Sequence, residues 1–592
     1  MDFMKFSKKV LLPVIMVLAT LLAACGSSST SGGTQTSTQA AKAPDKQQIL
    51  VYPIAGVADL ATLDPALAED VYSSQAIGTM FNGLVTYNNK TQIVPDLAKS
   101  YDLSKDGLSW TFHLRPDLKF SDGTALTSAD VVYSIDRALQ PATKSGFAIN
   151  ELGPIKDADK LNSGKIKTII GDSLLAPDPQ TVVIITSKKA AYLLDALTVS
   201  VGNVLEKSFV EKNGTSWTDH LADTGSGGNA GPWILQNYTR SKSLTFVPNP
   251  YYFGTKPQLK KVVMPLYSQK DTTYKDYQVN RVDFSFVPTI KLNDAKALPS
   301  GQYRTDPSLR LSWFAMNYLV KPFDNIKIRQ AFSLAVNRDL IATKVWKDSV
   351  TPSYHIIPNG TAGYNPDLTG PAGVKSTAGD ATTAKKLFQE GLQEEGMTTA
   401  TMPPIVFEVS SQGIQDQRDM YAAIQQMWQS TFGIPVKVND IDFNKLVKDI
   451  TGTVGNTNLM AFAIGWTGTP DPQNWMTNQF GPNSTINLGN YGNNQSTDAA
   501  QQKQAQQLME QADAEVASPE QRAKLYDQAE QQLVNDVAWL TLYQVKTVYV
   551  VKPCVANWPH NPFGQAGIAY QPDWANIYIT NAGPCANTAD YQ

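Results

Sequence analysis

The sequence predicts an α/β protein that is divided into several lobes. Its 592 residues are too many for one simple core, because a domain takes roughly 100 to 200 residues. Hydrophobic residues make up 42% of the chain and charged residues 17%, which indicates a globular protein. Short strand-like runs alternate with stretches whose apolar residues recur at helical spacing. This alternation favours α/β or α+β lobes.

The first half of the chain shows the alternation in its local patterns. Strands are expected at residues 49–56, 108–114 and 181–186, and residues 70–88 indicate a helix that runs into a strand. Thr127 is expected to cap a helix that has Asp130 at its third position and ends at Leu139. The glycine-rich run 224–231 lacks the Lys-Ser/Thr pair of a phosphate-binding loop. We expect this run to be a flexible link between lobes.

The second half of the chain shows the same alternation of strand-like and helical patterns. Residues 405–410 and 434–440 are strand-like, and the apolar residues between them that share one helical face are Met420, Ile424, Met427 and Trp428. Ser518 is expected to cap a further helix, which has proline at its first position and ends near Asn535. Residues 539–551 form a long β-rich run. The sequence has no repeat of fixed period, so a solenoid is not expected.

The N-terminus has the pattern of a secretory signal peptide. Lysines at positions 5, 8 and 9 precede the apolar run Val10–Leu22, which is followed by Ala23, Ala24 and Cys25. A charged start, a short apolar segment and small residues at the cut define such a leader. A cysteine directly after the small residues resembles the bacterial lipobox, in which Cys25 carries the lipid. The alternative is a short apolar segment with a chance cysteine.

These features predict where the protein is located. Residues 1–24 are the expected leader, and the Ser/Thr/Gly/Gln-rich residues 25–48 have little to bury, so we expect a flexible tether there. No later stretch has the roughly 18 continuous apolar residues of a membrane span. We therefore expect an extracytoplasmic protein that is anchored by lipid to the outer face of the cell membrane, in the periplasmic space if one is present.

Charge and cysteine content narrow the partners and cofactors. The chain has 50 Lys+Arg against 53 Asp+Glu, a net charge of −3, whereas a nucleic-acid partner requires a basic face. The four histidines are far apart without paired spacing, so neither a metal site nor a cofactor is expected. Cys554 and Cys585 remain once Cys25 is assigned to lipid. They either form a disulfide that closes a loop of about 30 residues or stay as two buried thiols.

One motif is shared with enzymes. Gly171-Asp172-Ser173-Leu174 spells the tetrapeptide of a lipase/esterase family whose nucleophile is the serine. That family places its base as Asp-x-x-His, and no histidine of this chain has an aspartate three residues before it. Scattered carboxylates act as an acid/base pair only where the fold brings two of them within roughly 5 to 10 Å. The sequence therefore does not predict an enzyme.

Seven segments, taken together, point to one family. They are LDP (63–65), FNGLV (81–85), VPDLA (94–98), LSWTFHLRPDLKFSDGTALTSADVVYSIDRA (108–138), GPWILQNYTRSKSLTFVPNPYYFG (231–254), FAMNYLVKPFDNIKIRQAFSLAVNRDLI (314–341) and GWTGTPDPQNW (465–475). In this order they resemble the peptide/nickel-type (cluster C, family 5) solute-binding proteins of bacterial ABC importers. Any one segment alone is only suggestive, but their joint order is specific.

The resemblance implies an α/β, two-lobed fold like that of the type II (cluster C) periplasmic binding proteins, with an extra subdomain in the first lobe. The expected parts are 49–85 for the first part of lobe I, 86–215 for the extra subdomain, 216–308 for the second part of lobe I, 309–540 for lobe II, and 541–592 for the return to lobe I with a cysteine-tied tail. Such a protein is a monomer that does no bond chemistry. It encloses a solute between closing lobes and delivers it to the permease subunits of an ABC importer, which cytoplasmic ATPase subunits drive.

The resemblance also implies which residues contact the ligand. They are Val71 and Tyr72 after the LDP segment, Trp313 and Asn317 on the strand that enters the second lobe, Trp466, Thr469 and Asp471 in the GW loop, and Tyr543 on the strand that leaves that lobe. For the aromatic residues the alternative is ordinary packing in the core.

One departure from the family pattern concerns the chemistry of the ligand. Peptide binders of this family carry an aspartate, spaced as GWxxD, that pairs with the α-amino group of the peptide, because a buried ammonium without a partner is costly. In this chain Thr469 stands at that spacing. Either Asp471 takes over the role or the ligand presents no amine there.

An oligopeptide is therefore the default ligand. The alternative within the binding proteins is an oligosaccharide or another neutral solute, which tryptophan faces and an Asn/Gln/Thr-rich composition suit. The alternative from another class is a secreted hydrolase. A sensor that reports ligand occupancy to a membrane receptor has the same sequence features as an importer component.

Overall fold

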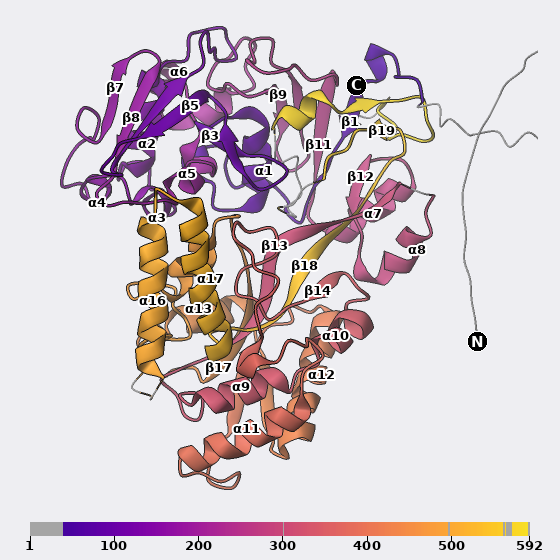
Figure 1. Ribbon diagram of the computed structural model, residues 1–592. Coiled ribbons are helices and arrows are strands. Elements are labelled where there is room, and N and C mark those ends of the chain that lie inside the picture. Colours follow the sequence, from indigo (N-terminus) through magenta and orange to yellow (C-terminus); the bar gives the residue numbers. More distant parts are fainter. Residues whose placement is uncertain are drawn as a thin grey trace, which may run out of the picture. The chain divides into compact units, whose positions relative to one another are not determined.

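The computed structural model describes residues 40–299, 301–494, 496, 498–560, 563 and 571–589. The expected leader, Cys25 and most of the expected tether lie outside the described residues. The folded unit starts at Ala41, so the tether prediction placed its end too late. Residues 45–47 form a short 3-10 helix, and Ala43 and Gln48 on either side of it are buried. The side chain of Gln48 exchanges hydrogen bonds with the backbone of Ile579 near the C-terminus. The fold is α/β with two lobes (Figure 1).

The first lobe is built on a mixed sheet. Its strand order is β1 (Ile49–Val51), β11 (Lys261–Tyr267), β10 (Ser243–Pro248) and β9 (Trp233–Thr239), with β2 (Ile54–Ala55) also paired to β11. β1 and β2 run parallel to β11, and the other pairs are antiparallel. Helix α1 (Val71–Met80) packs against this lobe with Asp70 as its N-cap. Asp70 accepts hydrogen bonds from the backbone N–H groups of Tyr72 and Ser73, which fixes where the helix begins.

The subdomain of the first lobe has its own sheet and core. The antiparallel sheet follows the order β5 (Ala98–Leu103), β6 (Ser109–Leu114), β8 (Thr181–Ile185) and β7 (Leu174–Asp178). Helix α2 (Ser128–Leu139) starts with the expected capping box of Thr127 and Asp130 and ends at the expected residue. The short helices α3 (Ala148–Leu152) and α5 (Leu193–Ala196) lie on the side that faces the second lobe (Figure 1).

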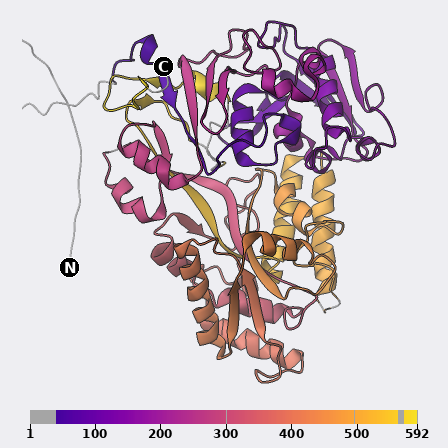
Figure 2. The same ribbon diagram turned by 180° about the vertical axis from the view of Figure 1, so that it is seen from behind.

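The second lobe surrounds a larger sheet. Its order is β12 (Phe284–Phe286), β18 (Leu540–Val551), β13 (Tyr303–Met316), β17 (Ala461–Thr467), β15 (Ile405–Val409) and β16 (Val436–Asp440), with β14 (Val350–Pro352) also paired to β18. Its main helices are α9 (Ile326–Leu334), α11 (Ala381–Glu394), α12 (Gln415–Phe432), α13 (Phe443–Thr451), α16 (Ala499–Ala514) and α17 (Pro519–Asp536). The pair α16 and α17 extends towards the subdomain near α3 in both ribbon views (Figures 1 and 2).

The remaining short elements connect these layers. They are β3 (Val85–Tyr87), β4 (Ile93–Pro95), α4 (Ala158–Asn162), α6 (Lys207–Asn213), α7 (Lys270–Gln278), α8 (Leu292–Lys296), α10 (Arg338–Leu340), α14 (Pro472–Trp475), α15 (Thr477–Phe480), β19 (Val555–Ala556) and β20 (Tyr578–Ile579).

Two long strands, β13 and β18, belong to both lobes. At one end of β18, Tyr549 and Val551 are part of the first-lobe core, and at the other end Leu540 and Leu542 are part of the second-lobe core. The antiparallel register between the strands shifts between Pro307 and Leu311 of β13. The two cores are therefore joined by one continuous but irregular ladder.

The glycine-rich run 224–231 differs from the expected flexible link. Residues 227–231 are buried within the first lobe, where the side chain of Asn229 donates to the carbonyl oxygens of Met80 and Trp233. A side chain on Gly231 would lie 2.1 Å from the carbonyl oxygen of Met80. The glycines thus allow a close approach of two backbones, which is a packing role that composition alone does not distinguish from flexibility.

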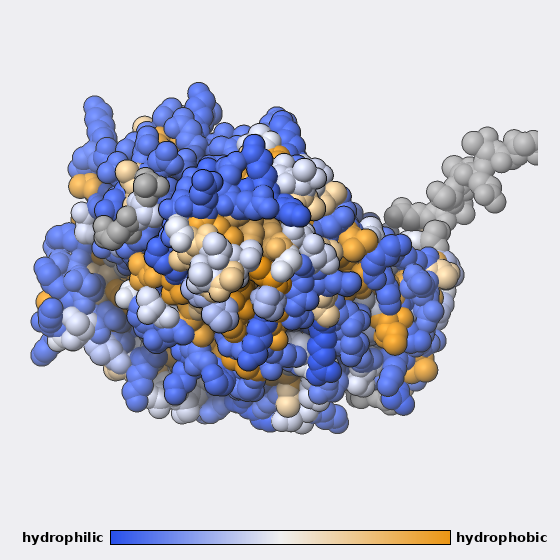
Figure 3. Space-filling view, turned by 90° about the horizontal axis from the view of Figure 1, so that it is seen from below, coloured by the Kyte–Doolittle hydropathy of each residue, from blue (hydrophilic) through white to orange (hydrophobic). Residues whose placement is uncertain are grey.

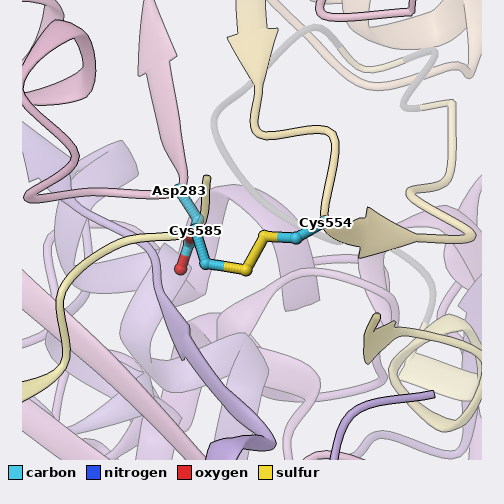
Figure 4. A group of neighbouring side chains, drawn as sticks. All are labelled: Asp283, Cys554 and Cys585. Atoms are coloured by element: carbon cyan, nitrogen blue, oxygen red, sulfur yellow. A yellow bond between two sulfur atoms is a disulfide. The ribbon is translucent and has the colours of Figure 1, made fainter. Parts of the chain in front are cut away.

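The C-terminal tail is tied to the first lobe by covalent and polar contacts. Cys554 and Cys585 form a disulfide across 31 residues of sequence. Asp283 lies beside it (Figure 4), and its carboxylate accepts the backbone N–H groups of Val51 and Ala586 at 2.8 and 2.7 Å. Burial raises the pKa of Asp283 to about 6. These are the residues that come nearest to a metal-ligand set in the described chain, but the two sulfurs are bonded to each other and are not thiolate ligands.

Hydrophilic residues cover most of the face that Figure 3 shows, and apolar residues gather near its middle. Among the described residues, no helix combines the length and the apolar character needed to cross a bilayer.

Candidate ligand-binding site

A large cavity is bordered by the first lobe, its subdomain and the second lobe. Its volume is about 1240 Å³, larger than typical ligand pockets, which measure roughly 300 to 1,000 Å³. The first lobe contributes the start of α1 and residues near 81–87, and the subdomain contributes α3 and residues near 188–203. The second lobe contributes the loop that follows β17, residues 466–486. A molecule in this space touches both lobes.

The loop after β17 is held in shape by its own side chains. A side chain on Gly468 would lie 2.3 Å from Oδ1 of Asn474 and 2.8 Å from the ring of Trp475, so the chain requires glycine there. Trp475 is fully buried, and its Nε1 donates to the carbonyl oxygen of Thr469 at 2.8 Å. Trp466 is 37% exposed, and its Nε1 donates to Asn474 Oδ1 at 3.3 Å. The loop therefore presents a fixed indole face to the cavity.

The wall formed by this loop is polar but uncharged. Among the described residues from Trp466 to Ile486 that line the cavity, none carries a charge, and the hydrogen-bonding side chains are those of Thr467, Thr469, Gln473, Asn474, Thr477, Asn478, Asn483, Ser484 and Thr485. Hydroxyl and amide groups can both donate and accept. This wall can bind backbone amides of a peptide or hydroxyl groups of a sugar.

Asp471 does not face the cavity, which corrects its expected role as a ligand contact. It is 6% exposed and caps α14 by accepting the backbone N–H of Gln473 at 2.8 Å. Its two carboxylate oxygens also accept Nη1 and Nη2 of Arg522 from α17, both at 2.8 Å. Because this bidentate pair occupies the carboxylate, Asp471 serves the structure of the loop and is not free to bind an ammonium group.

Thr469 lines the cavity and also joins the second lobe to the subdomain. Its Oγ1 donates to Oδ2 of Asp195 on α5 at 2.8 Å, and the hydroxyl of Tyr87 donates to Oδ1 of the same carboxylate at 2.5 Å. The backbone N–H of Ala191 donates to the carbonyl oxygen of Asp513 at 2.9 Å. Burial, with the nearby Asp471 charge as a second cause, raises the pKa of Asp195 to about 8. The contact between the lobes thus contains a carboxyl group that is protonated near neutral pH.

Replacing Asp195 by asparagine is expected to flatten the pH dependence of stability between about pH 4 and pH 8. Since the folded pKa lies above the ordinary value of 3.8, the folded chain holds a proton that the unfolded chain releases. The stabilisation that the bound proton provides is therefore complete below about pH 4 and is lost as the pH rises towards about 8. Asparagine resembles the neutral acid and has no proton to lose. Urea unfolding at pH 5 and pH 8.5 should show that the free energy of unfolding falls more between these pH values in the wild type than in the variant.

Equal losses in the two proteins would contradict a protonated Asp195. Burial also raises the pKa values of Glu151 and Asp513 to about 7. These groups are present in both proteins, so the difference between the two profiles isolates Asp195.

Two further expected contacts lie on α1. Val71 lines the cavity and is 44% exposed. Tyr72 points elsewhere: it packs against the first-lobe core, and its hydroxyl is close to Gly56, where an added Cβ would lie 2.5 Å from it. Neighbouring helical residues differ by about 100° in direction, so only one of the two faces the cavity.

Trp313, Asn317 and Tyr543 are core residues rather than ligand contacts. Trp313 is 2% exposed and stacks on Trp539 with ring centroids 4.3 Å apart. The Asn317 side chain is fully buried and donates to two backbone carbonyl oxygens. Tyr543 is 4% exposed and lies in the core on the other side of the sheet. All three lie on or next to β13 and β18, and residues on both faces of β13 are buried, so the alternative of ordinary packing holds for these aromatic residues.

The charged groups of the cavity were not predicted as ligand contacts. The cavity is lined by the acids Glu69, Asp70, Asp96, Glu151, Glu510 and Asp513 and by the bases Lys188 and Lys189. Asp96 belongs to the VPDLA segment, whereas the others lie in none of the seven family segments. Only the folded arrangement brings them to one space.

The serine of the lipase-like tetrapeptide is not arranged as a nucleophile. Ser173 is fully buried, and its Oγ donates to Oδ2 of its neighbour Asp172 at 3.1 Å. Each of the four histidines contacts an Asp or Glu elsewhere in the chain. Ser173 therefore lacks both access to substrate and a histidine base.

Comparison with known sequence families and solved structures gives a consistent result. The profile of the bacterial extracellular solute-binding proteins, family 5, matches residues 92–487. The periplasmic oligopeptide-binding protein OppA of Salmonella typhimurium is 27% identical over 505 residues, which cover 84% of this chain and 88% of that protein. Heme-binding protein A of Haemophilus influenzae is 26% identical over 572 residues, which cover 93% of this chain and 96% of that protein.

A similar structure is that of the periplasmic murein tripeptide-binding protein MppA in its unliganded open form. It has a TM-score of 0.75 and 25% sequence identity, and the match covers 92% of this chain and 99% of that one. The relatives thus share the fold across nearly the whole chain while their names give different ligands.

Proposed function

Because this chain belongs to the bacterial extracellular solute-binding proteins of family 5, we propose that it captures short peptides between its two lobes and delivers them to the permease of an ABC importer. The observation that carries the proposal is the cavity of about 1240 Å³ that residues of both lobes line. A ligand in that position favours the closed arrangement, because it gains contacts with the second lobe only when the lobes approach.

The chemistry of the cavity supports a peptide as the ligand. The OppA and MppA relatives are described as oligopeptide- and murein-tripeptide-binding proteins. The amide and hydroxyl groups of the wall 466–486 can pair with peptide N–H and C=O groups, and the exposed face of Trp466 can cover an apolar side chain. The relatives are binding proteins, and the proposal includes no catalytic step.

A neutral polyhydroxylated ligand is the second candidate, and the uncharged wall 466–486 is the observation that favours it. A thermal-shift screen separates the two. The probes are pools of free-amine tri- to pentapeptides, the same pools after N-acetylation, and neutral oligosaccharides. A ligand at 100 times its Kd stabilises the folded state by about 2.7 kcal/mol. Stabilisation by either peptide pool supports the proposal, and stabilisation by oligosaccharides alone overturns it in favour of the neutral ligand.

Replacing Trp466 by alanine is expected to weaken binding of the best peptide by about 10- to 100-fold, because a partly exposed indole that contacts ligand contributes on the order of 1 to 3 kcal/mol. Isothermal titration calorimetry measures the change. Tyr251→Ala is the matched control, since Tyr251 is 42% exposed and does not line the cavity. An unchanged Kd in Trp466→Ala would remove this residue from the binding site.

The topology of the chain and its cellular context follow from the same proposal. We place the first part of lobe I at 41–85, since the folded unit starts at Ala41, and the other boundaries at 86–215, 216–308, 309–540 and 541–592, with crossings on β13 and β18. Residues 1–24 are the leader, and Cys25 carries the lipid that holds the monomer at the outer face of the membrane beside permease subunits and their ATPase partners. A Cys25→Ala variant that stayed in the membrane fraction would contradict the anchor.

A further inference from the structure

Several acidic side chains gather where the subdomain meets the second lobe. The charges of Glu151, Asp471, Asp513 and Arg522 act on Tyr192 of the subdomain. Asp195 is a fourth acid, on which the charges of both Asp471 and Glu151 act. Arg522 is the one base among these neighbours, and Lys188 and Lys189 line the same cavity. Gathering acids in a poorly solvated place is unfavourable unless a cation joins them or protons bind.

Three of these four carboxylates accept hydrogen bonds from protein side chains. Asp471 is held by Arg522 at both oxygens. Asp195 accepts the hydroxyls of Tyr87 and Thr469, one at each oxygen. Asp513 accepts the hydroxyls of Tyr526 and Thr477, both at Oδ1. These hydrogen bonds shape the contact between the lobes.

Glu151 is different because it lines the cavity and has no partner. Among the described residues, no hydrogen bond or ion pair engages its carboxylate, and burial alone accounts for the rise of its pKa to about 7. The residue lies on α3, where Ala148 and Leu152 are fully buried in the subdomain core. That packing fixes the helix and leaves the side chain of Glu151 half-buried at the cavity wall.

We propose that Glu151 binds the α-ammonium group of the peptide. The inference rests on the proposed function, since it names the group that recognises one end of that ligand. A bound ammonium pairs with the one acid of this group that no protein side chain engages, and its three N–H donors match a carboxylate with free lone pairs. The partner of the amine is then on the subdomain and not on the uncharged wall that includes Thr469.

This arrangement accounts for the neutral residue at position 469. An ionised carboxylate there has no hydrogen to donate across the 2.8 Å that separates Thr469 Oγ1 from Asp195 Oδ2. A threonine donates to Asp195 instead. The polar contact between the lobes and a cationic site on Glu151 are therefore compatible in one structure.

The test combines a substitution with a change in the ligand. Binding of a free-amine peptide from the pools above and of its N-acetylated form is measured by calorimetry with the wild type, Glu151→Gln and Glu211→Gln. Glu211 is an exposed acid on α6 that does not line the cavity, so its variant controls for the loss of one negative charge. We expect N-acetylation to weaken binding to the wild type and to Glu211→Gln at least 10-fold. With Glu151→Gln we expect both forms to bind alike, at the affinity that the acetylated form has for the wild type.

The outcomes separate the two proposals. If peptides bind but N-acetylation has the same effect on Glu151→Gln as on the wild type, Glu151 is not the amine partner and the inference fails while the proposed function stands. If neither form binds the wild type, the proposed function fails and takes the inference with it. Glu151→Asp keeps the charge on a shorter side chain and should retain part of the preference for the free amine. If Glu151→Asp keeps this preference, the loss of the preference in Glu151→Gln comes from the missing charge and not from damage to α3.

The pH dependence of binding gives an independent readout. Because the raised pKa of Glu151 means that cation binding must displace a proton near neutral pH, the affinity of the free-amine peptide should fall as the pH is lowered from 8 to 6. Glu151 acts on Tyr192 and Asp195, on which Asp471 also acts, while Asp513 and Arg522 act on Tyr192; all five groups are unchanged in Glu151→Gln. The fall should therefore be smaller in that variant, and an equal fall in both proteins counts against the proposal.

Discussion

Arg329→Met is expected to destabilise the second lobe by about 3 to 5 kcal/mol, because that is the cost of removing one partner of a buried ion pair. Arg329 is fully buried. Its Nη2 donates to Oδ2 of Asp498 at 2.7 Å, and its Nε donates to the carbonyl oxygen of Asp536 at 2.8 Å. The guanidinium also lies 3.8 Å from the ring centroid of Tyr318. Methionine fills similar space but removes the cation from the buried carboxylate of Asp498, which keeps only neutral donors such as Gln502. The carbonyl oxygen of Asp536 loses one donor and keeps the hydroxyl of Tyr318.

Urea unfolding monitored by circular dichroism measures this loss. Arg418→Met is the control, because Arg418 is half exposed and lies 3.7 Å from Asp440 in a surface pair, which contributes about 0 to 1 kcal/mol. Arg329→Lys keeps the charge without the planar set of donors and should fall between the two. If Arg329→Met fails to fold, the intermediate stability of Arg329→Lys still tests the argument. A loss below about 1 kcal/mol in both Arg329 variants would contradict it.

Asp471→Asn is expected to cost about 3 to 5 kcal/mol of stability, because it leaves the buried guanidinium of Arg522 without its anion. The pair is bidentate, with both distances at 2.8 Å, and the two side chains are 8% and 14% exposed. The same substitution should leave the ratio of affinities for free-amine and N-acetylated peptides unchanged, since Asp471 faces Arg522 and not the cavity. This combination distinguishes a structural carboxylate from one that binds the ligand.

Asp172→Asn is the matched control for this prediction. Asp172 forms an exposed pair with Lys156 at 2.8 Å, so the substitution should change the free energy of unfolding by no more than about 1 kcal/mol. Unfolding titrations give the stabilities, and calorimetry gives the two affinities. If Asp471→Asn folded with normal stability and lost its preference for a free amine, Asp471 would be the partner of the ligand and its assignment to Arg522 would be wrong.

Local elements could be predicted from the sequence because their causes are local. The capping box of Thr127 and Asp130 fixed the start of α2, and the prediction that α17 begins after Ser518 is confirmed by the hydrogen bond from the Gln521 backbone N–H to Ser518 Oγ. Of the four residues expected on one face of α12, Met420, Ile424 and Trp428 are buried, and Met427 is partly buried against the same core. The prediction of an α/β, two-lobed fold is confirmed as well, since the seven family segments specify an architecture that no single element could.

The candidate site was less predictable because its residues depend on direction and distance in three dimensions. Trp313 and Trp466 are both tryptophans at the sheet shared by the lobes, yet one stacks in the core and the other faces the cavity. Asp471 and Arg522 are 51 residues apart, and nothing in either segment indicates that they pair. Glu151 lies in a short helix without a motif. Its importance arises from neighbours on other elements and from the lack of a partner, which only a structure reveals.

The irregular ladder between β13 and β18 has a consequence for affinity. Residues 308–310 of β13 have no backbone partner on β18, although the strands are paired on both sides of them. The side chain of Gln544 instead donates to the carbonyl oxygen of Ser308 at 3.0 Å. A change in the angle between the lobes is most easily absorbed here, where few ladder bonds resist it. We expect the stiffness of these three residues to influence the fraction of empty molecules that visit the closed state.

The measured Kd equals the intrinsic Kd divided by that fraction. Affinity in this protein is therefore a property of the whole chain as well as of the cavity wall. Substitutions at 308–310 can tighten or weaken capture of every ligand by one common factor, without touching any of them and without changing which ligand is preferred.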